Sequence, residues 1–187
     1  MSDWRERYET GTTWELKLYA YLLKLGRYAI LRVAHGGMFA PVLETWYRRI
    51  TAPDFQMHDM KTGDYVWPES KWKQTAARFY LANNEWRTGI DVDKYHHYRA
   101  VEEATHHSVA LFFTHDREGE VRLAWLKDKI DGVGRGDRMV YWSWDRLQYV
   151  ASIADVEACK PADLPVTGRT LFRPPSLQLG LDLDGDA

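Results

Sequence analysis

The feature that most constrains this chain is a carboxylate separated by a hairpin from a second carboxylate and a lysine. Asp54 opens the stretch 54–59, and Glu69, Ser70 and Lys71 lie within the stretch 65–72. The connection between the two, Met-Lys-Thr-Gly-Asp, has the composition of a hairpin turn. Side chains alternate along a strand, so Glu69 and Lys71 should share one face. The pattern therefore predicts strand, turn and strand, with Asp54 brought near Glu69 and Lys71.

This set of side chains suits metal-assisted phosphate chemistry. Two hard carboxylate oxygens, from Asp54 and Glu69, suit Mg²⁺ or Mn²⁺, and the backbone carbonyl of Ser70 could be a further ligand. Lys71 would lower the cost of forming hydroxide and neutralise charge on phosphorus. The bland alternative is a solvated strand face, because a Glu-x-Lys triplet is expected about once by chance in a chain of ordinary charge content. A second such triplet, Glu15-Leu16-Lys17, does occur.

Glu15 lies in a segment with helical periodicity, residues 12–25, which Gly26 can end. Its carboxylate falls on the apolar side of that helix, where a charge needs a partner. Two interpretations stay open: Glu15 forms a capping box with Thr12, or it supports the metal site.

The remaining segments predict an α/β sheet with helices on its faces. The expected strands are 28–34, 54–59, 65–72, 108–114 and 121–126, and a second helix is expected at 91–105. Residues 38–50 are ambiguous, 75–90 look irregular or partly helical, and 139–150 predict a strand or a short helix.

Composition predicts one domain, residues 1–160, followed by an extended tail, 161–187, rich in proline and glycine. No apolar run reaches the roughly 18 residues of a membrane span, and the charged N-terminus does not resemble a secretory signal. Cys159 is the single cysteine, which fits a reducing cytoplasmic location. The net charge of -2 does not by itself indicate nucleic-acid binding, although residues 17–49 are locally basic.

The motifs together resemble the PD-(D/E)XK nuclease superfamily, in particular archaeal-type Holliday junction resolvases and related phage nucleases. The resemblance covers roughly residues 11–126 and rests on four stretches: Gly11-Thr12-Thr13-Trp14-Glu15, residues 26–32, Pro53-Asp54, and Glu69-Ser70-Lys71. It implies a restriction-endonuclease-like mixed sheet flanked by helices. It also implies a Mg²⁺-dependent DNA endonuclease of recombination or repair, phage- or mobile-element-related, in which Asp54 and Glu69 hold the metal, Lys71 is catalytic and Glu15 completes the site. A junction resolvase would need two sites and therefore a homodimer.

The sequence departs from the family pattern in two places. Pro68 stands directly before Glu69 and removes a ladder donor, so this strand should be an edge or be bulged there. The stretch 35–52 is longer than in compact resolvases. These departures keep open a catalytically inactive DNA-binding or clamp-associated adaptor module. A weaker alternative is a protein-binding chain whose carboxylates are unrelated surface residues.

Several further side chains are candidate nucleic-acid contacts. Lys73, Gln74 and Arg78 follow Lys71 and could contact backbone phosphates, or form a solvated helix start. By the resemblance, one of Tyr95, His97 and Tyr98 could touch the substrate. Trp67 and Trp72 flank the site and could stack on unpaired bases, although most tryptophans should be core.

The tail carries a short motif of its own. Gln178, Leu179 and Leu181 resemble the peptide with which bacterial replication and repair proteins bind the sliding clamp, with Asp182 where an aromatic residue is usual. The alternative is an amphipathic tail that packs on its own domain.

Overall fold

The fold is seen in a computed structural model, which describes residues 4–33, 41–45, 48–73, 78–80, 85–133 and 138–160. The helices are α1 (Trp4–Lys24), α2 (Val92–Thr105) and α3 (Ile153–Glu157), with a 3₁₀ turn η1 (Trp144–Arg146). The strands are β1 (Tyr28–Arg32), β2 (Val42–Glu44), β3 (Arg49–Thr51), β4 (Phe55–Asp59), β5 (Tyr65–Lys73), β6 (Arg78–Tyr80), β7 (Glu85–Asp91), β8 (Ser108–His115), β9 (Glu120–Trp125), β10 (Gly132–Val133), β11 (Met139–Ser143) and β12 (Gln148–Ser152).

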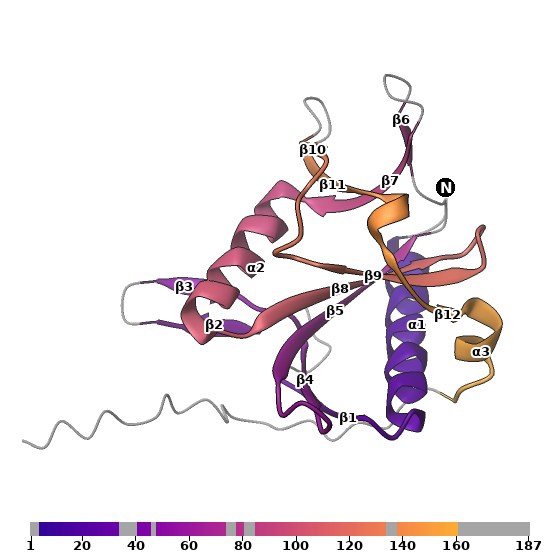
Figure 1. Ribbon diagram of the computed structural model, residues 1–187, viewed down its shortest axis with the longest axis horizontal. Helices are drawn as coiled ribbons and strands as arrows, with labels where there is room; N and C mark the ends of the chain where they lie inside the picture. The colour runs from indigo at the N-terminus through magenta and orange to yellow at the C-terminus, as the bar shows by residue number, and fades with distance from the viewer. Residues whose placement is uncertain are drawn as a thin grey trace, which may run out of the picture.

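Two sheets and a small hairpin organise the described residues (Figure 1). The larger sheet has six strands in the order β1-β4-β5-β8-β9-β12, and the smaller has the order β10-β11-β7-β6. Strands β5 and β8 run parallel, whereas the other described pairs are antiparallel. A parallel pair needs a crossover, and here the chain between β5 and β8 carries α2. The expected fold class, a mixed sheet flanked by helices, is confirmed.

The six-stranded sheet separates two apolar cores. On one face α1 packs its buried stripe, Leu18, Tyr19 and Leu22, against strand residues that include Phe55 and Phe112. On the other face α2, β7 and β11 cover residues of the same central strands, among them Trp67, Leu111 and Phe113. Neighbouring strand residues thus bury toward opposite faces, which is why β8 reads as an unbroken apolar run.

Helix α1 begins at Trp4, well before the predicted start at residue 12. Gly11 is inside the helix, where it is tolerated at a cost of about 1 kcal/mol because packing elsewhere compensates. The predicted capping box was therefore wrong, since Thr12 and Glu15 are in the helix interior and not at its N-terminus. The predicted C-terminal end is confirmed: α1 ends at Lys24, and Gly26 takes a positive φ of 66°.

In the three segments whose conformation the sequence left unsettled, the described residues are mostly in strands. Residues 75–90 were expected to be irregular or partly helical, but β6 and β7 form an antiparallel pair there. The described residues of 38–50 include β2 and the start of β3, and 139–150 form β11, η1 and the start of β12. Strand β7 owes its conformation to its neighbour β11, with which it pairs from Arg87 to Asp91. That pairing is tertiary, so local composition did not reveal it.

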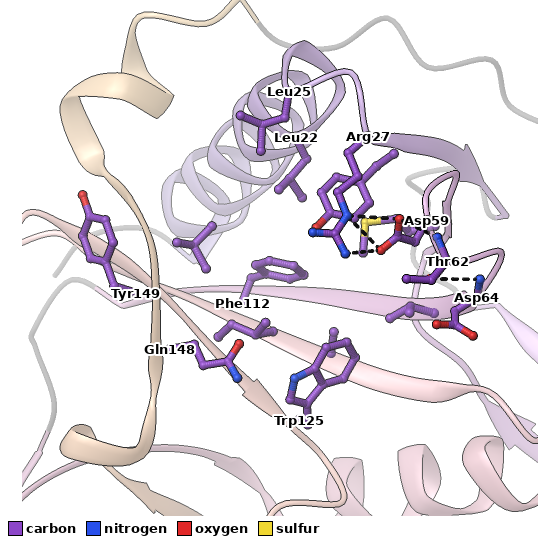
Figure 2. Close-up of a pocket in the computed structure, with 16 residues that line it drawn as sticks. Leu22, Leu25, Arg27, Asp59, Thr62, Asp64, Phe112, Trp125, Gln148 and Tyr149 are labelled. Atoms are coloured by element: carbon purple, nitrogen blue, oxygen red, sulfur yellow. Dashed lines mark hydrogen bonds and ion pairs between the residues drawn. The ribbon is translucent and has the colours of Figure 1, made fainter.

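One face of the six-stranded sheet is open beyond the C-terminal end of α1. Figure 2 shows this hollow, with Leu22 and Leu25 on one side, Phe112 and Trp125 on the sheet, and Arg27 bound to Asp59 at the rim. The Arg27 Nε donates to Asp59 Oδ2 at 2.9 Å. The hollow contains none of the predicted catalytic residues.

Within the described part of the chain, no helix is long and apolar enough to cross a membrane. The predicted tail, residues 161–187, lies outside the described residues, and so do its clamp-motif positions Gln178, Leu179 and Leu181.

Candidate active site

The candidate site lies where β4 and β5 separate. The two strands pair only at Met57 with Val66 and at His58 with Tyr65. Continuing that register by three residues would set Asp54 opposite Glu69. Strand β5 nevertheless pairs with β8 without interruption as far as Lys73. Among the described residues, the separation therefore leaves this edge of β5 without a paired strand in the stretch that carries Glu69 and Lys71.

The position of Pro68 on β5 agrees with the separation of β4 from β5, because Pro68 lies just beyond the last paired residue. The predicted bulge was wrong, because Pro68 faces Ala110 in an unshifted parallel ladder inside the sheet. Its carbonyl accepts a hydrogen bond from the Tyr19 hydroxyl at 3.4 Å, so it points away from β8. The nitrogen and carbonyl of one strand residue point to the same side. The missing N–H therefore falls where β4 has already separated, and β5 is an edge at that point alone.

Glu69 and Lys71 point the same way from β5, as strand alternation predicts. The Lys71 ammonium donates to Glu69 Oε1 in a close ion pair. The Glu69 side chain is 10% exposed and that of Lys71 is 30% exposed, so the pair is largely sheltered but still open to solvent from one side. A sheltered pair of this kind is strongly coupled, because little water screens it.

Three carboxylates from three elements act on this one ammonium. Burial by itself lowers the pKa of Lys71, but Glu69 and then Glu15 and Asp54 raise it above its ordinary value. Glu15 comes from α1, Asp54 from the bend before β4, and Glu69 from β5. The fold thus brings the four predicted catalytic residues into one electrostatic group, although the outermost two, Glu15 and Lys71, are 56 positions apart (71 − 15).

Two buried tyrosines from opposite faces of the sheet complete the group. Burial raises the pKa of Tyr98, and so do the charge of Glu69 and a hydrogen bond to it, followed by Asp54 and Glu15. Burial also raises the pKa of Tyr19, with Glu15, Glu69 and Asp54 adding to the effect. Both hydroxyls therefore remain protonated and act as hydrogen-bond donors. Sequence reasoning missed Tyr19, although its position four residues after Glu15 sets both on one side of α1.

The donor chemistry of the group fits a hard divalent cation. Its carboxylate oxygens are the ligands that Mg²⁺ and Mn²⁺ prefer, and Mg²⁺ needs only one or two of them beside waters and phosphate oxygens. Among the described residues, no set of three His, Cys, Asp or Glu side chains is arranged to hold a metal ion. Glu69 is engaged with Lys71 instead, so a cation would have to compete with the ammonium for it.

The predicted nucleic-acid contacts have mixed outcomes. Tyr98 was one of three side chains that could touch the substrate, but it is 1% exposed and directed at Glu69, so this alternative was wrong for Tyr98. Trp67 is likewise 1% exposed, and its Nε1 donates to Thr105 at 3.3 Å, which excludes stacking on a base. The stretch that begins at Lys73 was also expected, as one alternative, to start a helix, whereas β5 continues through Lys73.

Lys73 ends β5 and is half-buried. Burial lowers its pKa, repulsion from Lys71 lowers it further, and Asp91 partly offsets both. Gln74 lies outside the described residues, and Arg78 is placed in β6 without a described side chain. Ser70 pairs with Phe112 and, by alternation, directs its side chain away from Glu69.

Comparison with known proteins does not assign this chain to a family. No protein-family model matches it, and no curated protein matches it. Among solved structures it is similar to Hjc, a Holliday junction resolvase from the archaeal hyperthermophile Archaeoglobus fulgidus. That match covers 72% of this chain and 89% of the Hjc chain, with a TM-score of 0.48 and 17% sequence identity. A likeness at this level assigns neither an activity nor a catalytic residue.

Proposed function

We propose that this protein is a divalent-metal-dependent DNA endonuclease that hydrolyses phosphodiester bonds in a resolvase-like or repair-type reaction. The observation that supports the proposal is the convergence of Glu15, Asp54 and Glu69 on the ammonium of Lys71. Structural ion pairs seldom gather three carboxylates around one partly exposed cation, because the uncompensated negative charge is costly. Such an arrangement is typical of a site built to receive additional positive charge.

In this proposal Asp54 and Glu69 hold Mg²⁺ or Mn²⁺, with the Ser70 carbonyl as a further ligand and Glu15 in support. The metal, when bound, supplies Lewis acidity and a water of lowered pKa. Without metal, burial lowers the pKa of Lys71 but Glu69, Glu15 and Asp54 raise it above its ordinary value, so the side chain carries a positive charge. Its role is to stabilise negative charge that develops on the phosphate oxygens.

The choice of DNA as substrate rests on the motif resemblance described from the sequence. Lys73, Gln74 and Arg78 are proposed to contact backbone phosphates beside the site. Binding of a sliding clamp through Gln178, Leu179 and Leu181 stays a prediction. A homodimer is proposed for the case in which the substrate is a symmetric junction that needs two cuts.

A second function is favoured by one observation. Glu69 already has a close ion pair with Lys71, and no set of three ligands is arranged for a metal among the described residues. A catalytically inactive DNA-binding or adaptor module would keep Glu69 paired with Lys71 in this way. The two candidates differ in metal binding, because only the nuclease requires Asp54-dependent binding of Mg²⁺ or Mn²⁺.

The test uses the full chain with three substrates: a four-way junction, a linear duplex and single-stranded DNA, each with Mg²⁺, Mn²⁺ or EDTA. We expect metal-dependent cleavage that Lys71→Ala reduces by about 10²–10³-fold, the usual effect of removing one transition-state charge stabiliser. Lys61→Ala, in the exposed β4–β5 turn, is the matched control and should cleave normally. DNA binding without cleavage of any substrate, unchanged in Lys71→Ala, would replace the nuclease with the binding module.

A further inference from the structure

The hydroxyl of Tyr98 lies beside the cluster of Glu15, Asp54 and Glu69, although its ring is buried in an apolar core. Tyr98 lies in the middle of α2 and packs into the apolar core with Trp67, Val101 and Trp142. For packing in that core the ring alone would suffice, and phenylalanine would supply it without a buried hydroxyl. The hydroxyl instead bonds to Glu69, a proposed metal ligand on β5.

Glu69 is thus held by two donors of different kinds. Lys71 is a long, flexible side chain on the same strand, and 30% of it is exposed. Tyr98 has two rotatable bonds and a ring that the core immobilises, and it is 1% exposed. The ammonium can therefore turn away from the carboxylate, whereas the hydroxyl cannot do so unless α2 moves off the sheet.

From this asymmetry we propose that Tyr98 is a positioning residue, which holds the Glu69 carboxylate in its metal-binding orientation when Lys71 turns toward the substrate. The proposal rests on the proposed function, because it assigns a task within the same site. A donor from the protein to a metal-ligating carboxylate fixes the orientation of that ligand before the metal arrives.

The neighbouring carboxylates make this positioning necessary. Asp54 and Glu15 are close enough to act on Tyr98 and Lys71, so Glu69 is surrounded by like charge once the ammonium leaves. A carboxylate without a fixed donor would rotate away from such neighbours. The Tyr98 hydroxyl is placed to oppose that rotation from the α2 side, while Tyr19 binds the adjacent Pro68 carbonyl from the α1 side.

The experiment compares wild-type protein, Tyr98→Phe and Tyr21→Phe for direct Mn²⁺ binding by electron paramagnetic resonance without DNA. The same proteins are then titrated with Mn²⁺ in the cleavage assay. Because phenylalanine keeps the packed ring, we expect Tyr98→Phe to fold but to bind Mn²⁺ about 10- to 100-fold more weakly, the usual effect of losing a partner behind a metal ligand. Saturating Mn²⁺ should restore most of its cleavage rate, a recovery that damage to the fold would not allow.

Tyr21→Phe is the control, since Tyr21 is a partly buried tyrosine on α1 that belongs to the core on the other face. Binding is measured in the cold, below any unfolding transition seen for the variants. Equal Mn²⁺ affinity of Tyr98→Phe and wild type, with cleavage by both, would overturn the positioning role and leave the nuclease intact. Absence of Mn²⁺ binding and cleavage by wild type would overturn the proposed function, and the positioning role with it.

Discussion

Replacement of Lys71 by methionine should uncouple the stability of this protein from its activity. Methionine keeps most of the apolar stem, so packing along β5 changes little, but the one cation that Glu15, Asp54 and Glu69 share is lost. Removing one partner of a buried ion pair costs about 3–5 kcal/mol. Since 30% of the Lys71 side chain is exposed, water screens part of this effect, and we expect about 2 kcal/mol. For a domain of this size that corresponds to a melting temperature about 4–8 °C lower.

Divalent cation should reverse the loss. In wild type the ammonium competes with a metal for Glu69, whereas in Lys71→Met the carboxylates have no such competitor. Mn²⁺ should therefore raise the melting temperature of Lys71→Met more than that of wild type, by mass action on a tighter site. Cleavage should still be lost, because the charge that stabilises the transition state is absent.

The assay is thermal unfolding in EDTA and in Mn²⁺, with Lys61→Met in the exposed β4–β5 turn as the control. The reasoning would be refuted if Lys71→Met in EDTA were as stable as wild type. It would also be refuted if Mn²⁺ stabilised both proteins equally, because the ammonium and the metal would then not share the carboxylates.

Two further predictions concern the fold around the site. A Cβ on Gly89 would collide with the backbone carbonyl of Val140 on β11, so Gly89→Ala should disrupt the β7–β11 pairing and lower the melting temperature, whereas Gly119→Asn, at a turn position with a positive φ and open space, should not. Burial lowers the pKa of His115 from 6.5 to about 4, with Lys73 and Arg122 adding to the effect, so the unfolded chain binds the extra proton between these values. Stability should therefore fall as pH drops from 6.5 toward 4, and His115→Gln, measured by denaturant unfolding across that range, should show a smaller fall; an unchanged profile would contradict the assignment.

The predicted elements succeeded where local signals are strong. The 3.6-residue periodicity of α2, the apolar run of β8 and the turn chemistry between β4 and β5 all depend on neighbours in sequence. The sequence predictions failed where the conformation of a segment depends on a partner that is distant in sequence. Strand β7 follows the pair Asn83-Asn84 in sequence and is a strand because β11 pairs with it.

Tyr98 and Pro68 also depend on distant partners within the site. By the family resemblance Tyr98 was one of three side chains that could touch the substrate, yet α2 turns this ring into the core. Pro68 was expected to mark an edge or a bulge of the sheet. Its effect is confined to one side of β5 because β4 separates from β5 just before it.

The sequence by itself determined that Glu69 and Lys71 share a face, because a strand has a side-chain period of two whatever surrounds it. It also determined the end of α1, since Gly26 adopts a left-handed backbone at little cost. Only the tertiary structure decided that Glu15, Asp54 and Tyr98 meet Lys71, and that Tyr19 supports Pro68 from behind. Those meetings require α1 and α2 to pack on opposite faces of a sheet whose strands β4 and β5 diverge, and such packing follows from buried area over the whole domain rather than from any local pattern.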